Sequence, residues 1–208
     1  MRFTASAAEA KSIMNMNLYE AMEEKLIDLL SQRKRHLMND YHLMPSAVLV
    51  ALFVKSGERH ILFIKRSQGV KDHKGEISFP GGLWEERDQR IEKTALREAL
   101  EEIGVRPSDV KILGLLDDIK TISSSYRVTP VVGVISHPYP FTINRVEVDE
   151  IIEIPMNHLM DKGNSGEESI IRNGVTYTGQ VYHYKHHLIW GATSRILSNL
   201  FELLTKIL

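Results

Sequence analysis

Three glutamates near the middle of this 208-residue chain have the spacing of neighbours on one helix face. Glu101 and Glu102 follow Glu98 by three and four residues, so a helix brings the three carboxylates into one small area. Like charges at this spacing destabilise an isolated helix, and negative charge is unfavourable near a helix C-terminus. A bound cation offsets both costs. The spacing therefore predicts a cation site.

The types of residue in this cluster indicate which cation it would bind. Carboxylate oxygens are hard ligands, the cluster contains no histidine, and the chain contains no cysteine. Such donors favour Mg²⁺ or Mn²⁺ over zinc. A solvated acidic helix face is the alternative interpretation. The segment Phe79-Pro80-Gly81-Gly82 favours the metal site, because glycines let a backbone loop approach closely packed groups.

Charge is distributed unevenly around these glutamates. Residues 55–74, which include Arg66 and Lys71, carry a net formal charge of +4, and residues 85–102 carry −3. Basic side chains beside a metal-binding acidic segment suit a substrate with a diphosphate and a further phosphate. The side chains would hold the outer phosphate while the metal neutralises the diphosphate. Ordinary surface lysines are the alternative for any single position.

The whole chain has no such bias. Its formal charge is −1, so we expect neither a nucleic-acid partner nor an anionic membrane surface. The longest apolar run, residues 48–54, is far shorter than the roughly 20 residues that span a bilayer. The first residues lack a secretory pattern. With no cysteine, a disulfide framework and a thiol nucleophile are excluded. We expect a cytoplasmic protein that acts on a small molecule.

Hydrophobic periodicity predicts the elements that position these residues. Apolar residues at helical spacing from Leu18 onward predict a helix, and a second helix is expected over 91–103, ended by Gly104. Alternating or apolar runs predict strands, the first two joined in a hairpin by the polar residues 55–59. The expected strands are 46–54, 60–64, 110–116, 128–135, 150–154 and 175–184, and a terminal helix is expected over 192–207.

Strands and helices without regular alternation indicate an α/β (α+β) fold, a mixed β-sheet packed between helices in an α/β/α sandwich. We divide the chain into an N-terminal helical extension, residues 1–40, and one domain, residues 41–208. The apolar stripe of the first helix needs a partner. Packing on the core, a homodimer interface and a gate over the site all remain open.

The acidic segment resembles the signature of the Nudix hydrolases, G-x5-E-x7-R-E-U-x-E-E-x-G-U, in which U is a bulky apolar residue. The chain departs from it in two ways. Asp88 replaces the first glutamate and lies eight intervening residues before the arginine, and Ala99 is small for its U position. The matching residues are Gly82, Arg97, Glu98, Glu101, Glu102, Gly104 and Val105.

The upstream residues resemble the coenzyme A pyrophosphatase branch of that family, whose signature is L-L-T-x-R-[S/A]-x3-R-x3-G-x3-F-P-G-G. The spacing is intact, and Lys71 keeps a positive charge where the signature has arginine. Phe63 and Ile64 replace its second leucine and its threonine. Further similarities extend the resemblance over about residues 45 to 205.

The resemblance implies a Nudix-like fold and metal-dependent hydrolysis of the diphosphate of coenzyme A or acyl-CoA. The products would be 3′,5′-ADP and 4′-phosphopantetheine or its acyl form. Two alternatives remain: a broader hydrolase acting on ADP-ribose or dinucleotides, and a catalytically silent nucleotide-binding domain. The implied metal ligands are Glu98, Glu101 and Glu102, the catalytic candidates are Glu98, Arg97 and Glu150 (a possible general base), and the substrate-binding residues are Arg66, Lys71, Gly81 and Gly82.

Overall fold

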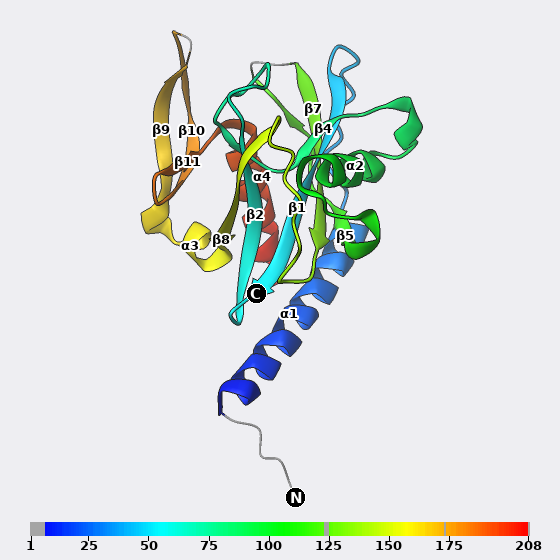
Figure 1. Ribbon diagram of the computed structural model, residues 1–208, viewed down its shortest axis with the longest axis vertical. Coiled ribbons are helices and arrows are strands. Elements are labelled where there is room, and N and C mark those ends of the chain that lie inside the picture. Colours follow the sequence, from blue (N-terminus) through cyan, green and yellow to red (C-terminus); the bar gives the residue numbers. More distant parts are fainter. Residues whose placement is uncertain (1–6, 123–124, 173, 208) are drawn as a thin grey trace, which may run out of the picture.

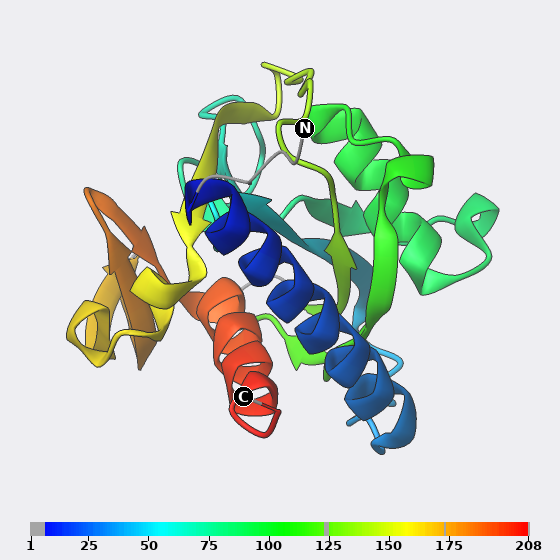
Figure 2. The ribbon, with the colours of Figure 1, turned by 90° about the horizontal axis from the view of Figure 1, so that it is seen from below.

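The computed structural model describes residues 7–122, 125–172 and 174–207. One mixed β-sheet forms the centre. Helix α2 (Ile91–Ile103) covers one face of the sheet, and helices α1 (Ala7–Gln32) and α4 (Gly191–Leu204) cover the other (Figures 1 and 2). This is the α/β/α layering that the sequence predicts.

The expected hairpin forms the centre of the sheet. Strands β1 (Met44–Lys55) and β2 (Glu58–Arg66) are antiparallel and joined through Ser56 and Gly57, both with positive φ, as a two-residue hairpin turn requires. The strand order is β3-β2-β1-β7-β5, with β1 parallel to β7 and the other pairs antiparallel. The remaining bounds are β3 Ile77–Ser78, β4 Gly81–Leu83, β5 Lys111–Leu115, β6 Ile119–Lys120, β7 Tyr126–Val134 and β8 Val148–Pro155.

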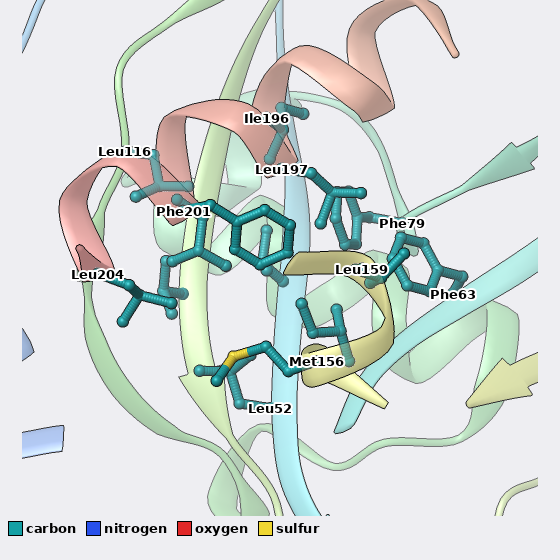
Figure 3. Packing of buried hydrophobic residues seen from close by; sticks show 14 of the residues in the cluster. Leu52, Phe63, Phe79, Leu116, Met156, Leu159, Ile196, Leu197, Phe201 and Leu204 are labelled. Carbon is teal, nitrogen blue, oxygen red and sulfur yellow. The ribbon is translucent and has the colours of Figure 1, made fainter. Parts of the chain in front are cut away.

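Strand β1 has buried side chains on both faces and therefore divides the core in two. Ala47, Leu49 and Ala51 pack with α2. Val50 and Leu52 belong to the larger cluster on the other face, with residues of α4 and of the short helix α3 (Met156–Met160) (Figure 3). The site described below lies on the α2 side.

The first helix is part of this core. Met22, Leu26 and Leu30 are buried in the larger cluster, whereas Leu18 is 64% exposed. Glu23 forms an ion pair of 2.7 Å with Arg59 of β2, which is only 1% exposed. Arg59, which contributes to the basic charge of residues 55–74, is therefore unavailable to a substrate. Of the roles left open for this helix, the structure shows packing on the sheet.

A second sheet was not predicted. Strands β9 (Ser165–Arg172), β10 (Val175–Tyr184) and β11 (His187–Ile189) form an antiparallel sheet beside the main one (Figure 1). Only β10 has a clear alternating pattern, because β9 begins with the polar run Ser165–Ser169. Among the described residues, no helix is long and apolar enough to cross a membrane.

Candidate active site

Helix α2 carries the predicted carboxylates and has the bounds expected from the sequence. Ala95, Ala99 and Ile103 are fully buried against the sheet, and Gly104 ends the helix with φ +74°. Ala99, small for its position in the signature, lies in one cluster with the small residues Ala47 and Ala51 of β1. The helix axis therefore lies close to the sheet.

Asp88 organises the N-terminal half of the site. Its carboxylate accepts hydrogen bonds of 2.9 Å from Glu85 N–H, Thr94 Oγ1 and Arg97 Nε. Burial alone would raise the pKa of Asp88, but the bonds from Arg97, Glu85 and Thr94 lower it to about 2. The shorter aspartate and the additional intervening residue thus still produce a buried ion pair with the arginine of the signature.

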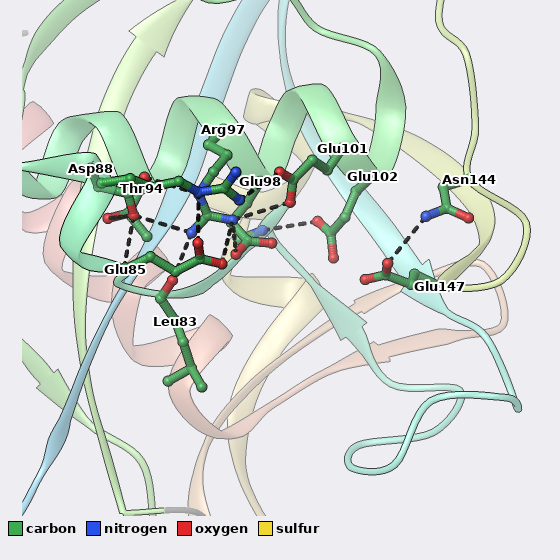
Figure 4. A network of polar contacts seen from close by, with 12 residues as sticks. Leu83, Glu85, Asp88, Thr94, Arg97, Glu98, Glu101, Glu102, Asn144 and Glu147 are labelled. Atoms are coloured by element: carbon green, nitrogen blue, oxygen red, sulfur yellow. Dashed lines mark hydrogen bonds and ion pairs between the residues drawn. The ribbon is translucent and has the colours of Figure 1, made fainter.

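Arg97 connects this pair to the predicted metal ligands. Its Nη1 donates to Glu98 Oε1 at 2.7 Å and to Glu101 Oε2 at 3.1 Å, and its Nη2 donates to the Leu83 carbonyl at 2.8 Å. Figure 4 shows the arginine between the acidic side chains and strand β4. Arg97 therefore holds the carboxylates of Glu98 and Glu101 in place and ties them to β4.

Gly81 and Gly82 bring the backbone of β4 against two of the glutamates. A Cβ atom on Gly82 would lie 2.5 Å from Glu98 Oε1, so a side chain at that position would displace the carboxylate. The Gly81 N–H donates to Glu102 Oε2 at 2.9 Å, and a Cβ there would lie 2.3 Å from the Ala47 carbonyl oxygen. Backbone contact therefore requires Gly81, and Gly82 leaves room for the Glu98 carboxylate against β4.

Two carboxylates in the C-terminal half of α2, those of Glu98 and Glu102, have raised pKa values despite the arginines beside them. Burial raises the pKa of Glu102 to about 8, although the Gly81 N–H and Arg66 act in the opposite direction. Burial also raises the pKa of Glu98 despite its bond to Arg97. The negative charge of Glu147 raises both values further.

Glu147 is the residue that the sequence analysis missed. It follows Glu102 in the row of acidic side chains beside α2 (Figure 4), and its Oε1 accepts a bond of 3.1 Å from Asn144 Nδ2. Asn144 N–H donates to the Glu102 carbonyl at 2.9 Å, which ties this loop to the end of α2. No local pattern distinguishes Glu147 from other acids, because a loop distant in sequence brings it here.

Glu150 faces away from this cluster. It pairs in register with Lys65, and its charge acts on His187 of β11. Along β8, Ile151 packs on the α2 side, whereas Ile152 packs on the opposite side. Since side chains alternate along a strand, Glu150 shares the side of Ile152.

Of the predicted basic residues, Arg66 lies beside Glu102. Arg66 Nη1 is 3.8 Å from Glu102 Oε1. Lys71 is exposed on the loop between β2 and β3, where the Arg66 Nε donates to the Asp72 carbonyl. On the same loop, the bond to Glu76 raises the pKa of His73. Arg66 is therefore gathered with the carboxylates, and Lys71 is exposed on the loop that follows.

The donor set fits a hard divalent cation in part. Glu102 supplies buried carboxylate oxygens and Glu98 partly buried ones, and burial raises the pKa of both, as is typical of carboxylates placed to receive a cation. Glu101 is turned toward Arg97 and Arg87. In the part of the chain that the structure describes, no three acidic or histidine side chains converge as a complete metal cage.

Comparisons with known proteins give a family match and two similar relatives. Residues 43–172 match the model of the NUDIX domain family. The chain is similar to the Nudix hydrolase NudL of Photorhabdus laumondii subsp. laumondii, with 34% identity over 169 residues, 81% of this chain and 88% of that protein. Its similarity to NudL of Escherichia fergusonii is 32% over 155 residues, 74% of this chain and 80% of the relative.

A solved structure supports the fold alone. The Nudix hydrolase RenU from M. smegmatis superposes with a TM-score of 0.56 and 16% sequence identity, covering 79% of this chain and 88% of that one.

Proposed function

This chain belongs to the NUDIX domain family, and on that premise we propose that it is a metal-dependent diphosphatase acting on coenzyme A or acyl-CoA. One observation carries the proposal. The carboxylates of Glu98, partly buried, and Glu102, buried, lie against the Gly81–Gly82 backbone, with Arg66 at one end. The choice of coenzyme A rests on the upstream residues 62–82, which resemble that branch of the family.

Glu98 and Glu102 would hold Mg²⁺ or Mn²⁺, with Glu101 as the third ligand once it leaves its arginine partners. When bound, such a cation neutralises the diphosphate and lowers the pKa of a water molecule. Arg97 keeps Glu98 in place, and the Gly81 N–H orients Glu102. These contacts fix the direction in which the carboxylates face the substrate.

A carboxylate in the cluster accepts the proton of the attacking water. We favour Glu147 over Glu150 for this role, because the charge of Glu147 acts on Glu98 and Glu102 whereas Glu150 lies by His187. Glu98 is the second candidate. Attack by water on one phosphorus breaks the P–O–P bond and releases two phosphate monoesters. From coenzyme A these are 3′,5′-ADP and 4′-phosphopantetheine.

Arg66 and Lys71 are the residues that would give the protein its preference for coenzyme A. A cationic rim next to the diphosphate site suits a substrate with an additional phosphate, because charge-assisted hydrogen bonds to phosphate are strong. Coenzyme A carries such a group at the 3′ position, and ADP-ribose does not. Loss of that phosphate, or the change Lys71→Gln, is therefore expected to weaken turnover.

The test offers the purified protein coenzyme A, 3′-dephospho-CoA and ADP-ribose with Mg²⁺ or Mn²⁺, and separates the products by chromatography. The proposal predicts 3′,5′-ADP from coenzyme A, no product after chelation, and much slower turnover of the other two compounds. Equal rates on ADP-ribose would replace it with the broader hydrolase. Absence of metal-dependent turnover of all three would indicate a silent nucleotide-binding domain.

A further inference from the structure

A cavity of about 370 Å³ opens beyond the N-terminal end of α2. We call it the Trp84 pocket. Its floor is formed by Pro45 of β1 with Arg127 and Thr129 of β7, and Trp84 and Ile91 line it. The segment between α1 and β1 also lines it, through Leu37 among others. A volume of this size is typical of small-molecule sites.

The floor of the pocket continues the sheet face on which the catalytic candidates lie. In the parallel pair, Pro45 is in register with Arg127, and Ala47 with Thr129. Ala47 packs with α2, so side chains two residues along the strand share that face. Ala47 is also the register partner of Gly82, the residue against Glu98. The pocket therefore begins about 7 Å along β1 from this point.

Helix α2 connects the pocket to the carboxylates in the same way. Ile91 lines the pocket and lies seven residues before Glu98, two helical turns away on the same face. This separation is about 10 Å along the helix. The Leu83 carbonyl, next to Trp84, accepts the bond from Arg97. Pocket and carboxylates thus form one continuous side of the molecule.

Basic groups lie at the end of α2 opposite the pocket. Glu102 lies one turn beyond Glu98, and Arg66 is 3.8 Å from Glu102. The loop that contains Lys71 follows Arg66 in the chain. A diphosphate bound at Glu98 and Glu102 would therefore have two unlike neighbours. One is the basic loop, and the other is the Trp84 pocket.

The pocket combines apolar surface with charges that already have partners. Trp84 is 38% exposed and Leu37 54% exposed. Arg35 Nη1 lies 3.3 Å from Asp118 Oδ1, and Arg127 Nη1 donates to the Met38 carbonyl at 2.9 Å. A guanidinium carries five N–H donors, more than these contacts engage. Apolar walls with N–H donors suit an uncharged chain with amide carbonyls and methyl groups.

We propose that the Trp84 pocket binds the pantetheine arm of the substrate, an uncharged chain with amide groups, while the basic loop binds the phosphate-bearing nucleotide. This inference rests on the proposed function, because the arm exists only on coenzyme A and its derivatives. It assigns the substrate one direction along α2, with the arm toward Ile91 and the 3′-phosphate toward Arg66.

The two reaction products allow the Trp84 pocket and the basic loop to be tested separately. Isothermal titration would measure the dissociation constants of 4′-phosphopantetheine and 3′,5′-ADP for the whole protein in Mg²⁺, in wild type and in Trp84→Ala. Trp84 is 38% exposed, so its truncation is expected to leave the fold intact, which circular dichroism would check. Tyr41→Ala is the matched control, because Tyr41 is 97% exposed and does not line the pocket.

Trp84→Ala is expected to raise the dissociation constant of 4′-phosphopantetheine about tenfold, on the scale of one lost aromatic contact. The dissociation constant of 3′,5′-ADP should stay within about twofold. Lys71→Gln should show the reverse. If Trp84→Ala weakened 3′,5′-ADP instead, the pocket would bind the nucleotide and the inference would be overturned. Unchanged binding of both products would overturn it too. Failure of the proposed function is recognised by a different result: the wild-type protein would not cleave coenzyme A.

Discussion

The acidic network along α2 and the turn before it has buried carboxylates with opposite properties at its two ends. At the N-terminal end, Asp88 accepts bonds from Arg97, Thr94 and a backbone N–H, and its pKa falls to about 2. At the C-terminal end, Glu102 accepts one backbone N–H, and burial raises its pKa to about 8. Both side chains are 5% exposed or less.

The difference lies in the partners that each group has within the chain. Asp88 is neutralised by the protein itself, so it stabilises the fold as an anion. Glu102 is not neutralised by the protein, so its ionised form destabilises the fold until a cation binds. We infer that the Asp88 end is structural and that the Glu98–Glu102 end is kept for a ligand, at a cost in stability that functional sites commonly carry.

The largest expected effect is on activity. Glu98→Gln removes one anionic ligand from the proposed metal site and should lower kcat by about a thousandfold, the upper range for loss of one electrostatic contact in a transition state. Glu92→Gln, on the first turn of the same helix and paired with Arg90, is the matched control. Turnover by Glu98→Gln close to that of wild type would contradict the assignment.

The second prediction concerns stability without metal. The pKa of Glu102 is raised in the folded state. Its contribution to the free energy of unfolding is therefore complete below pH 4.5 and is lost as pH rises through 8. Glu102→Gln removes that loss. In chelator at pH 9 its free energy of unfolding should exceed that of wild type by on the order of 3 kcal/mol, and the difference should vanish near pH 4. Urea unfolding at several pH values measures this. A Glu102→Gln variant less stable than wild type at pH 9 would contradict the contrast between Asp88 and Glu102.

A smaller effect distinguishes the two late carboxylates. Glu147→Gln should lower kcat by about a hundredfold if it accepts the proton, the lower range for general-base catalysis, and should flatten the acid limb of the pH–rate profile. Glu150→Gln should leave both unchanged. The opposite pattern would restore the expectation drawn from the sequence.

The smallest predicted effect is at Asp88. Its folded-state pKa is lowered from 3.8 to about 2, so its stabilisation is present above pH 4 and is lost as pH falls through 2. Asp88→Asn should cost about 2 kcal/mol of unfolding free energy at pH 7 and almost nothing near pH 2. Thermal unfolding across this range tests it. A constant difference at every pH would mean that packing, not charge, is responsible.

The sequence predicts the parts of this site that depend on local signals. The bounds of α2 are as expected because its apolar periodicity and the Gly104 that ends it are contiguous in the sequence. The contacts of Gly82 and Arg97 follow from the spacing of one motif. The hairpin β1–β2 was predicted for the same reason, since its turn and both strands are contiguous.

The parts that depend on tertiary contacts were not predictable. Glu147 reaches the site because Asn144 binds the end of α2, a contact between segments about 40 residues apart in the chain. The orientation of Glu150 depends on an irregularity in the β2–β8 register at Lys65 and Arg66. A one-residue shift reverses the side that a strand residue faces, so a motif alone cannot assign it.

Proton release on metal binding tests the contrast most directly. At pH 7 a carboxyl group with a pKa of about 8 is mostly protonated, and a cation that binds the carboxylate must displace the proton. Calorimetric titration of Mn²⁺ in buffers of different ionisation enthalpy should therefore show release of nearly one proton in wild type and in Asp88→Asn, and far less in Glu102→Gln. Binding of Mn²⁺ without proton release, or equal release in all three proteins, would contradict the assignment of Glu102 as a carboxylate kept for a cation.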